Sequence, residues 1–418
     1  MTDHRTVVVT GVGALTPLGA DARTLWDALL AGLSGVRRLD SSVTADLPVT
    51  IAAPVTADLT AQLGRVRARS LDRVQQLALV AAREAWHDAG APAVAAERLA
   101  VVIGSGVGGV MTLLSQYDML RESGARRLSP WGVTMFMPNG PAAAVGLELG
   151  ARAGVHTPVS ACASGAEAIA LGLDLIRAQR ADVVVCGGAE AAIHRLTLGA
   201  FAAIRALSRH AGLPESASRP FDRDRDGFVL GEGAGVVVLE SAAHAAARGR
   251  APYAELAGAG LTADAHHVTQ PEPTGVGAAR AMRAALHDAR AVPASVVHVN
   301  AHATATPLGD LAEAIAIRSI LGAETDRVPV SATKSMTGHL LGAAGAMEAV
   351  ITVLSVCAGF APASPTLENL GDDIQLDVVR CQPRPLREGL ALSNSFGFGG
   401  HNVTLAFRPF VAARSVGA

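Results

Sequence analysis

Residues 160–186 read SACASGAEAIALGLDLIRAQRADVVVC, which is a turn of small residues, a helical segment and a Val-rich strand in succession. The apolar spacing across residues 164–179 predicts a helix, and residues 182–186 form the continuous apolar run of a strand buried on both faces. The same two patterns alternate along the chain. Val-rich runs occur at residues 6–10, 99–103, 235–239, 296–299, 328–331 and 403–406, and helical segments at residues 73–86, 277–289 and 340–354. This alternation predicts an α/β fold.

A weaker pattern is an internal repeat. In the first half the turn around Cys162 leads into a long Ala-rich helix, and in the second half the turn at residues 332–335 leads into residues 338–354. Each turn carries a chemically active side chain where the helix begins. Because α/β proteins look self-similar at this level, the sequence leaves a true repeat and a coincidence equally open.

Composition limits the classes of function. The 418 residues include 35 basic and 37 acidic side chains, and 50% are hydrophobic. That apolar content excludes a disordered chain, and the charge balance gives no reason to expect binding to nucleic acid or to an anionic membrane. The longest apolar run, residues 349–360, is shorter than the roughly 20 residues that span a bilayer, so it is predicted to be a buried helix.

The cysteines indicate a reducing compartment. They have neither CxxC nor zinc-ligand spacing and stand at Cys162, Cys186, Cys357 and Cys381. The first ten residues lack the basic and then apolar pattern of a signal peptide. We therefore expect reduced thiols in a soluble, cytoplasmic protein that spans no membrane.

Two segments place reactive side chains at the ends of predicted elements. Cys162 stands where a helix begins, and there the helix dipole and free backbone N–H groups favour a thiolate. A buried, inert cysteine is the alternative. His302 follows the strand at residues 296–299, where α/β proteins usually place ligand contacts. Thr304 and Thr306 would face one side and could bind an extended polar ligand, the alternative being an ordinary solvated loop.

Two further segments complete the pattern. Lys334 and His339 lie in residues 332–347, a stretch that is otherwise uncharged, and a buried lysine is expected to meet an acid. Residues 393–402 read SNSFGFGGHN, and their glycines allow main-chain N–H groups to point into a cavity. A cysteine, two histidines and a glycine-rich loop together are typical of nucleophilic catalysis.

In these four segments the chain resembles the elongating β-ketoacyl-acyl-carrier-protein synthases, the Cys-His-His condensing enzymes of the thiolase superfamily. The likeness extends over residues 7–407. It implies the thiolase fold, an α/β fold in which two pseudo-repeated halves form a layered α-β-α-β-α core. Residues 1–250 would form the half with the nucleophile and residues 251–418 the half with both histidines, the lysine and the glycine loop, packed as one compact unit.

The resemblance also implies catalytic roles. Cys162 would accept the acyl chain, and His302 and His339 would donate hydrogen bonds to the malonyl thioester carbonyl. The backbone N–H groups of Cys162 and Phe398 would form the oxyanion hole, and Phe398 would gate the nucleophile. Lys334, paired to Glu313, would orient the site.

Substrate-binding residues follow in the same way. Thr304 and Thr306 would hold the phosphopantetheine arm, and the acyl pocket and glycine loop would add Val107, Phe201, Gly397 and Gly399. The arm is delivered by an acyl carrier protein, and the resemblance implies neither a metal nor a permanently bound cofactor. Ala303 and Ala305 stand where glycine, or glycine or serine, is commoner, which would narrow the pantetheine channel slightly.

The implied reaction is the decarboxylative Claisen condensation of malonyl-acyl carrier protein with an enzyme-bound acyl chain, as in fatty-acid elongation. The alternative is the catalytic subunit of a type II polyketide synthase for a reduced or polyene chain, paired with a chain-length-factor homologue. A non-catalytic scaffold is disfavoured because the cysteine, lysine and both histidines are all present. Chain length, saturation and the identity of the carrier do not follow from the sequence.

Two kinds of protein partner are expected. Carrier proteins are acidic, so basic side chains should surround the mouth of the site. The candidates by family position are Arg65, Arg67, Arg69, Arg126, Arg127 and Arg205, with an ordinary solvated arginine face as the alternative. The family forms dimers through its sheet edges, and residues 135–149 could supply the interface of a homodimer or of a heterodimer with a homologous subunit.

Overall fold

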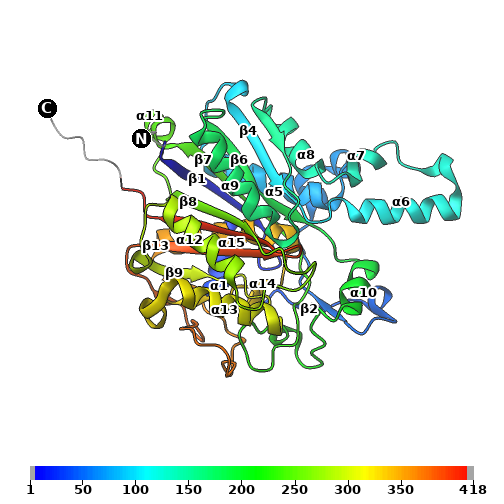
Figure 1. The fold of residues 1–418 in the computed structure, drawn as a ribbon. Helices are drawn as coiled ribbons and strands as arrows, with labels where there is room; N and C mark the ends of the chain where they lie inside the picture. Colours follow the sequence, from blue (N-terminus) through cyan, green and yellow to red (C-terminus); the bar gives the residue numbers. More distant parts are fainter. Residues whose placement is uncertain (1–4, 412–418) are drawn as a thin grey trace.

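A computed structural model describes residues 5–411 and contains a ten-stranded mixed sheet (Figure 1). Five strands come from the first half of the chain and five from the second. The first five are β1 (Val7–Leu15), β4 (Leu99–Gly104), β5 (Gly154–His156), β6 (Val183–Glu190) and β7 (Gly233–Ser241). The second five are β8 (Ala254–Ala263), β9 (Val296–Asn300), β10 (Val330–Ser331), β13 (Leu390–Gly397) and β14 (His401–Arg408).

The two sets of strands repeat one topology. From the centre of the sheet outward, the order is β1-β7-β6-β4-β5 on one side and β8-β14-β13-β9-β10 on the other. In both sets the first two pairings are antiparallel and the last two are parallel. A short antiparallel pairing of β1 with β8 joins them. The internal repeat and the two pseudo-repeated halves are therefore confirmed.

Four long helices form the remaining layers. α5 (Arg73–Asp88) covers one outer face against β1 and β7, and α12 (Val276–Asp288) covers the other against β8 and β14. α9 (Ser164–Arg177) and α15 (Ala344–Ala358) contact each other between the two half-sheets (Figure 1). These helices and strands give the predicted α-β-α-β-α layering.

The two central helices begin in matched surroundings. A 3-10 turn, η3 (Ala161–Ala163), precedes α9, and η7 (Leu341–Ala343) precedes α15. The first residue of each turn has a left-handed backbone, with φ of +52° at Ala161 and +46° at Leu341. The helices touch backbone to backbone, because a Cβ on Gly165 would lie 2.8 Å from the nitrogen of Ala346. A Cβ on Gly345 would likewise lie 3.1 Å from the nitrogen of Ala166.

The apolar segment that was predicted to form a buried helix lies largely in the core helix α15. Residues 341–358 are long and apolar enough to cross a membrane by composition, yet 78% of that window is buried inside the fold. α15 lies between two half-sheets, so its apolar side chains are satisfied by protein contacts.

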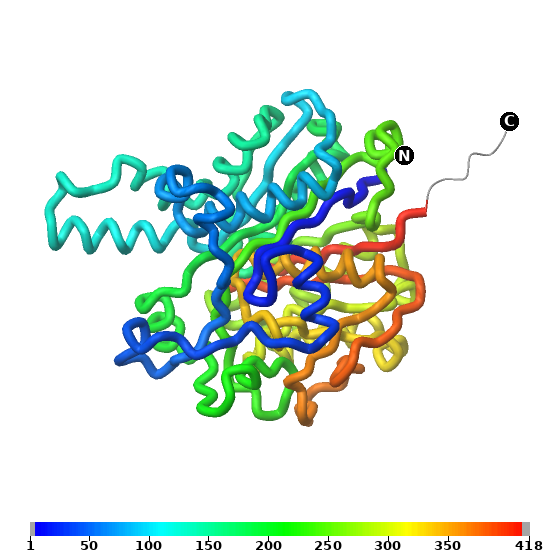
Figure 2. The backbone as a smooth tube through the Cα atoms, turned by 180° about the vertical axis from the view of Figure 1, so that it is seen from behind, coloured from blue at the N-terminus to red at the C-terminus, as the bar shows by residue number. Residues whose placement is uncertain are grey.

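One segment leaves the body of the molecule. α6 (Val110–Ser123), η2 (Ala125–Arg127) and α7 (Gly132–Phe136) form an arm that extends outward in both views (Figures 1 and 2). Other helices surround the core at α1 (Ala22–Leu30), α2 (Ser41–Thr44), α3 (Leu59–Leu63), α4 (Arg65–Ala68), α8 (Gly140–Leu149), α10 (Arg195–Ala203), α11 (Ala242–Ala247), α13 (Pro307–Leu321) and α14 (Lys334–Thr337). Two small sheets pair β2 (Arg37–Arg38) with β3 (Ile51–Ala52) and β11 (Phe360–Ala361) with β12 (Arg384–Pro385).

The helix crossing makes a testable prediction. In Gly165→Ala the new methyl group would meet the backbone nitrogen of Ala346 at 2.8 Å and the carbonyl oxygen of Gly342 at 2.9 Å. Backbone cannot move aside cheaply, so we expect the free energy of unfolding in urea to fall by about 3 kcal/mol. Gly199→Ala is the control, since its nearest neighbour is a leucine methyl at 3.5 Å and alanine favours a helix interior. Equal stability of the two variants would contradict the close crossing.

Candidate active site

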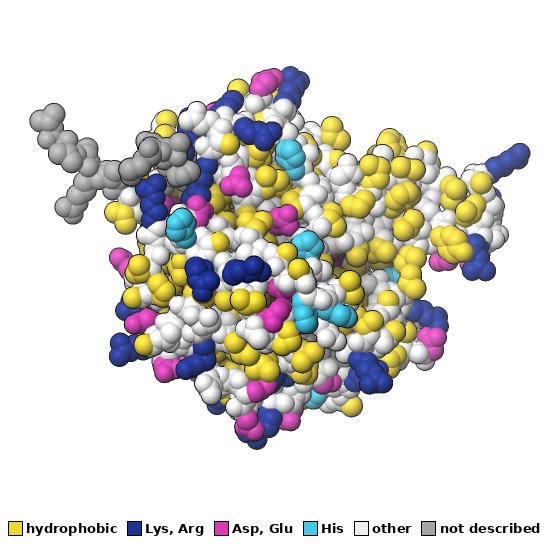
Figure 3. All heavy atoms as spheres, viewed as in Figure 1, with side chains coloured by type: hydrophobic (Ala, Val, Ile, Leu, Met, Phe, Trp, Pro, Cys, Tyr) yellow, Lys and Arg dark blue, Asp and Glu magenta, His cyan; other side chains and the backbone are white. Residues whose placement is uncertain are grey.

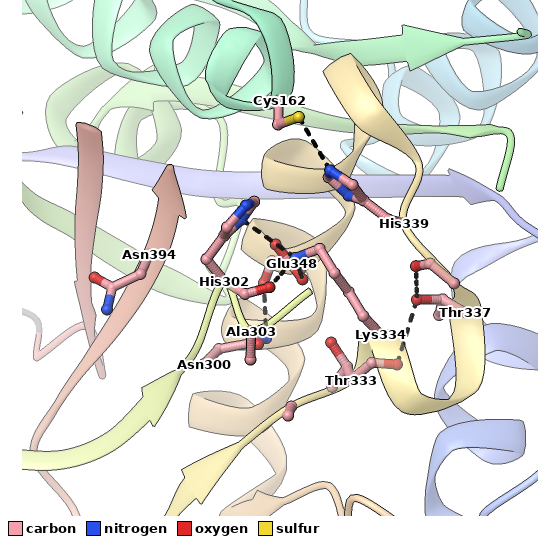
Figure 4. A network of polar contacts seen from close by, with 12 residues as sticks. Cys162, Asn300, His302, Ala303, Thr333, Lys334, Thr337, His339, Glu348 and Asn394 are labelled. Carbon is pink, nitrogen blue, oxygen red and sulfur yellow. Dashed lines mark hydrogen bonds and ion pairs between the residues drawn. The ribbon is translucent and has the colours of Figure 1, made fainter. Parts of the chain in front are cut away.

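The nucleophile candidate lies at the beginning of a central helix. Cys162 is in η3, directly before α9, and its side chain is buried. Its Sγ lies 3.0 Å from Nε2 of His339, which comes from the second half of the chain (Figure 4). Cys162 and His339 therefore meet because α9 and α15 begin side by side.

A second histidine completes the group. His302 follows β9, and its ring centroid lies 5.4 Å from that of His339 with the rings nearly perpendicular. Burial lowers the pKa of both imidazoles well below the usual value, and the charge of Lys334 acts in the same direction. Both rings are therefore neutral near pH 7 and can donate a hydrogen bond from one nitrogen.

Lys334 has a partner that the sequence did not reveal. Its buried Nζ forms an ion pair with Oε1 of Glu348 on α15, donates to the carbonyl oxygen of His302 at 2.5 Å and lies 3.4 Å from His302 Nδ1 (Figure 4). Burial raises the pKa of Glu348 to about 7, and the lysine charge acts against that rise. The predicted pairing of Lys334 with Glu313 is wrong.

Glu313 has a different task. From α13 its two carboxylate oxygens accept the backbone N–H groups of His302 at 2.8 Å and Ala303 at 2.7 Å. Asp310, on the same helix, accepts the N–H of Ala305 at 3.1 Å. These bonds hold a strained loop, because Ala303 and Ala305 have φ values of +27° and +70° in the region that favours glycine. The carboxylates of α13 thus hold this loop at backbone angles that alanine rarely adopts.

The thiol sits among backbone N–H groups. Burial raises the pKa of Cys162 to about 12, while the Lys334 charge and the N–H groups of Phe398 and Cys162 itself act to lower it. The turn between β13 and β14 reaches the nucleophile because Gly397 has no side chain; a Cβ there would lie 3.2 Å from the nitrogen of Cys162. The two N–H groups expected to form an oxyanion hole therefore lie beside Sγ.

A cavity of about 270 Å³ opens onto these groups. Five of the six predicted substrate-binding residues line it, namely Val107, Phe201, Thr304, Thr306 and Gly397, and so does the predicted gate Phe398. Gly399 does not; it lies in the turn, where its N–H donates to Val268 at 2.8 Å. The hydroxyls of Thr304 and Thr306 are 3.0 Å apart on one side, and the Phe201 ring lies 6.4 Å from Phe398 on the other. Within residues 5–411, no three His, Cys, Asp or Glu side chains are grouped to hold a metal ion.

The predicted docking arginines lie on three segments. Arg65 and Arg69 are exposed at α4, and Arg205 is exposed after α10. Arg67 is only half-exposed and forms an ion pair with Glu148 at 2.6 Å. The remaining two, Arg126 and Arg127, are exposed on η2 of the arm, which extends away from the body of this chain (Figure 1).

Sequence reasoning missed two buried acids. Glu348 was detectable, because it ends the uncharged stretch at residues 332–347 and is the sole charge on α15. Glu190 ends the apolar strand β6 and lines the cavity beside Cys162. The signal for Glu190 in the sequence was an acidic residue at the end of a Val-rich strand.

The fold and the Cys-His-His group define a condensing enzyme of the thiolase type. Residues 4–245 match the family described as Beta-ketoacyl synthase, N-terminal domain, and residues 253–368 match Beta-ketoacyl synthase, C-terminal domain. The chain belongs to the β-ketoacyl synthase family, whose members are acyl-transferring enzymes.

Known relatives cover nearly the whole chain. The 3-oxoacyl-[acyl-carrier-protein] synthase 2 of Mycobacterium tuberculosis is 46% identical over 404 residues, which are 96% of each protein. Among solved structures, a ketosynthase bound to a hexaketide, in complex with its type II polyketide synthase acyl-carrier protein, superposes with a TM-score of 0.91 at 30% identity, covering 98% of this chain and 100% of that one. The ishigamide ketosynthase/chain length factor gives 0.90 at 30% identity with the same coverage.

The buried ion pair can be tested by removing one charge or both. Lys334→Met would leave the Glu348 carboxylate buried without a cation, and we expect the free energy of unfolding to fall by about 3–5 kcal/mol. Lys334→Met combined with Glu348→Gln should recover much of that loss, because no uncompensated charge remains. Urea denaturation of both variants measures the difference. If the double variant is no more stable than the single one, the pairing is wrong.

Proposed function

We propose that this chain elongates fatty-acyl groups by decarboxylative condensation with malonyl-acyl carrier protein, with Cys162 as the nucleophile. The observation that carries the proposal is the 3.0 Å contact between Cys162 Sγ and His339 Nε2, with His302 beside it at one cavity. In the first step Sγ attacks the thioester carbonyl of an acyl carrier protein. The carrier thiol leaves with the proton, and the acyl group is held on Cys162.

The histidines would then act on the malonyl thioester. Loss of CO₂ leaves an enolate, whose oxygen accepts hydrogen bonds from Nε2–H of His302 and His339. For His302 the tautomer is set by Lys334: the ammonium lies 3.4 Å from Nδ1, which makes that nitrogen an acceptor and puts the proton on Nε2. No charged imidazole is needed, which agrees with the lowered pKa of both rings.

Formation of the carbon–carbon bond releases the acyl chain from Cys162. The enolate carbon attacks the acyl carbonyl on Cys162, and the tetrahedral oxyanion is held by the N–H groups of Cys162 and Phe398. The C–S bond then breaks, the β-ketoacyl chain stays on the carrier, and Sγ takes up a solvent proton. Phe398, on the turn after β13, is placed to cover the nucleophile, with Thr304 and Thr306 holding the phosphopantetheine arm.

We also propose that the active unit is a dimer in the cytoplasm. The strand β5 is at one edge of the sheet, next to α8, where Leu147 and Val155 are exposed. The arm adds exposed apolar side chains, including Tyr117, Trp131 and Val133, and hydrophobic atoms gather over it in Figure 3. A second copy covering these surfaces would remove them from water.

Within each chain we place the boundary of the halves near residue 250, between β7 and β8.

A polyketide role remains the second candidate. Solved ketosynthases that superpose on this chain at 30% identity include a type II polyketide synthase complex and a ketosynthase paired with a chain length factor. The 46% identity to a 3-oxoacyl-[acyl-carrier-protein] synthase 2 favours the fatty-acid role.

The proposal is tested with purified protein, acyl carrier proteins loaded with saturated acyl groups, and malonyl-acyl carrier protein. Cys162→Ala should abolish both acyl-enzyme formation, followed by protein mass spectrometry, and β-ketoacyl product. The matched control is Cys186→Ala, which removes a buried thiol that lies on β6 and does not line the cavity. Condensation by Cys162→Ala would refute the mechanism. Activity that needs a co-expressed homologous subunit would favour the polyketide role.

Docking of the carrier makes a separate prediction. Reversing charge in Arg65→Glu with Arg69→Glu should raise the KM for the carrier by about tenfold at low salt, with kcat nearly unchanged, because steering acts before chemistry. Arg180→Glu is the control, since Arg180 precedes β6 at the end away from the cavity. An equal rise in KM for both variants would point to net charge alone.

A further inference from the structure

Glu190 is a buried carboxylate that the condensation mechanism does not use. It is the last residue of β6, its side chain is inaccessible to solvent, and it lines the cavity together with Cys162, Val107 and Leu341. No Lys, Arg or His within residues 5–411 forms an ion pair with it. A buried acid is costly unless hydrogen bonds satisfy it, so its partners indicate its task.

Every partner of Glu190 is a donor from one of two loops. Oε2 accepts the backbone N–H of Gly106 at 2.7 Å and of Gly342 at 3.0 Å. Oε1 accepts the hydroxyl of Ser105 at 3.0 Å and, more weakly, the N–H of Val107 at 3.4 Å. The carboxylate thus joins the loop after β4 to the turn η7, which begins two residues after His339.

The two loops are in close contact at this point. A Cβ on Gly342 would lie 2.3 Å from the nitrogen of Gly106, and a Cβ on Gly106 would lie 2.6 Å from Glu190 Oε2 and 3.6 Å from the carbonyl oxygen of Ala161. Ala161 is the left-handed residue directly before the nucleophile. Three backbone segments that shape one side of the cavity therefore meet around a single carboxylate.

The contact between Glu190 and Gly342 can be compared with the equivalent position in the other half of the fold. Gly342 is the middle residue of η7, as Cys162 is the middle residue of η3, and each turn is followed directly by a central helix. The N–H of Cys162 faces the position where an oxyanion forms, and the equivalent N–H of Gly342 is occupied by the Glu190 carboxylate. One half of the pseudo-repeat keeps its N–H groups open for chemistry, and the other uses them to fix the wall of the cavity.

We propose that Glu190 is a positioning residue that fixes residues 105–107 and the turn containing Leu341 relative to each other, and so sets the depth of the acyl pocket beside Cys162. The proposal rests on the proposed function only in naming the pocket's occupant as an acyl chain. Without the carboxylate, Val107 and Leu341 would move inward, because an apolar cavity is filled when its walls are free to move. Longer chains would then be excluded before shorter ones.

The test measures the depth of the pocket without a carrier protein. Iodoacetamide and N-octyl iodoacetamide both alkylate thiols, and because Cys357 and Cys381 are exposed, each rate is measured on the Cys162 peptide by mass spectrometry. The ratio of the two rates at Cys162 cancels changes in the reactivity of its thiol and reports the room for a chain. In Glu190→Gln, an NH2 group that cannot accept a hydrogen bond replaces one carboxylate oxygen and faces N–H donors. We expect the rate of alkylation by N-octyl iodoacetamide, divided by the rate with iodoacetamide, to fall by about tenfold or more. Ser105→Ala, which removes one donor, should lower the ratio by a smaller factor and keeps the test valid if Glu190→Gln does not fold.

The matched control is Glu84→Gln. Glu84, on α5, also joins two segments by accepting backbone N–H groups, from Ala14 and Ala22 at 2.8 Å each, and burial raises its pKa to about 7 as it does for Glu190. It does not line the cavity, so the ratio should stay at the wild-type value even if the melting temperature falls. An unchanged ratio in folded Glu190→Gln and in Ser105→Ala, or an equal fall in Glu84→Gln, would overturn the proposal.

Acyl transfer separates this proposal from the proposed function. Wild-type chain that takes no acyl group from any carrier protein would refute the proposed function, while the alkylation ratio would still decide the role of Glu190. If the wild-type chain is acylated, Glu190→Gln should lose transfer of long chains more than of short ones. Equal losses at all chain lengths would overturn the pocket-depth role.

Discussion

The backbone contact between the beginnings of α9 and α15 is the constraint on which the rest of the structure depends. Gly165 and Gly345 let the two helices touch without side chains between them. That contact brings Cys162 from one half within 3.0 Å of His339 from the other. The half-sheets pack on either side of these two helices, and the carboxylates of α13 hold the loop of His302 beside their N-terminal ends.

Electrostatics in the site favours neutral donors over charged ones. Burial lowers the pKa of both histidines, and Lys334, the buried cation beside His302, is compensated by Glu348. In the proposed mechanism the lysine therefore acts through His302, since its ammonium lies 3.4 Å from Nδ1 and donates to the carbonyl oxygen of that residue. A neutral imidazole with a defined N–H is suited to an enolate that forms and disappears in one turnover.

Sequence alone predicted the elements whose patterns are strong. The Val-rich runs became β1, β4, β6, β7, β9, β10 and β14, and the Ala-rich segments became the four long helices. Three strands of the ten-stranded sheet were missed. β5 has only three residues, β8 is rich in alanine and glycine, and β13 buries polar side chains, among them Asn394, which is hydrogen-bonded to Glu313 and Thr404. The arm was also missed, because α6 buries only Thr112 and so shows no apolar face packed against the core.

Site residues with local motifs were placed together by the fold, whereas pairings across the chain were harder to predict. Cys162, His302 and His339 each stand in a recognisable segment, and all three line one cavity. The partner of Lys334 was misassigned because the choice between Glu313 and Glu348 depends on which helix passes beneath the lysine. That is a property of tertiary packing; the sequence only marks Glu348 as a candidate, because it is the sole charge on α15.

The pseudo-repeat has a consequence for how the enzyme fails. Cys162 Sγ and His339 Nε2 belong to different halves, so the distance between them depends on the relative orientation of the two halves. A small rotation at the α9–α15 contact would leave both half-sheets folded and yet separate sulfur from nitrogen. Loss of reactivity should therefore precede loss of secondary structure whenever the molecule is heated or strained.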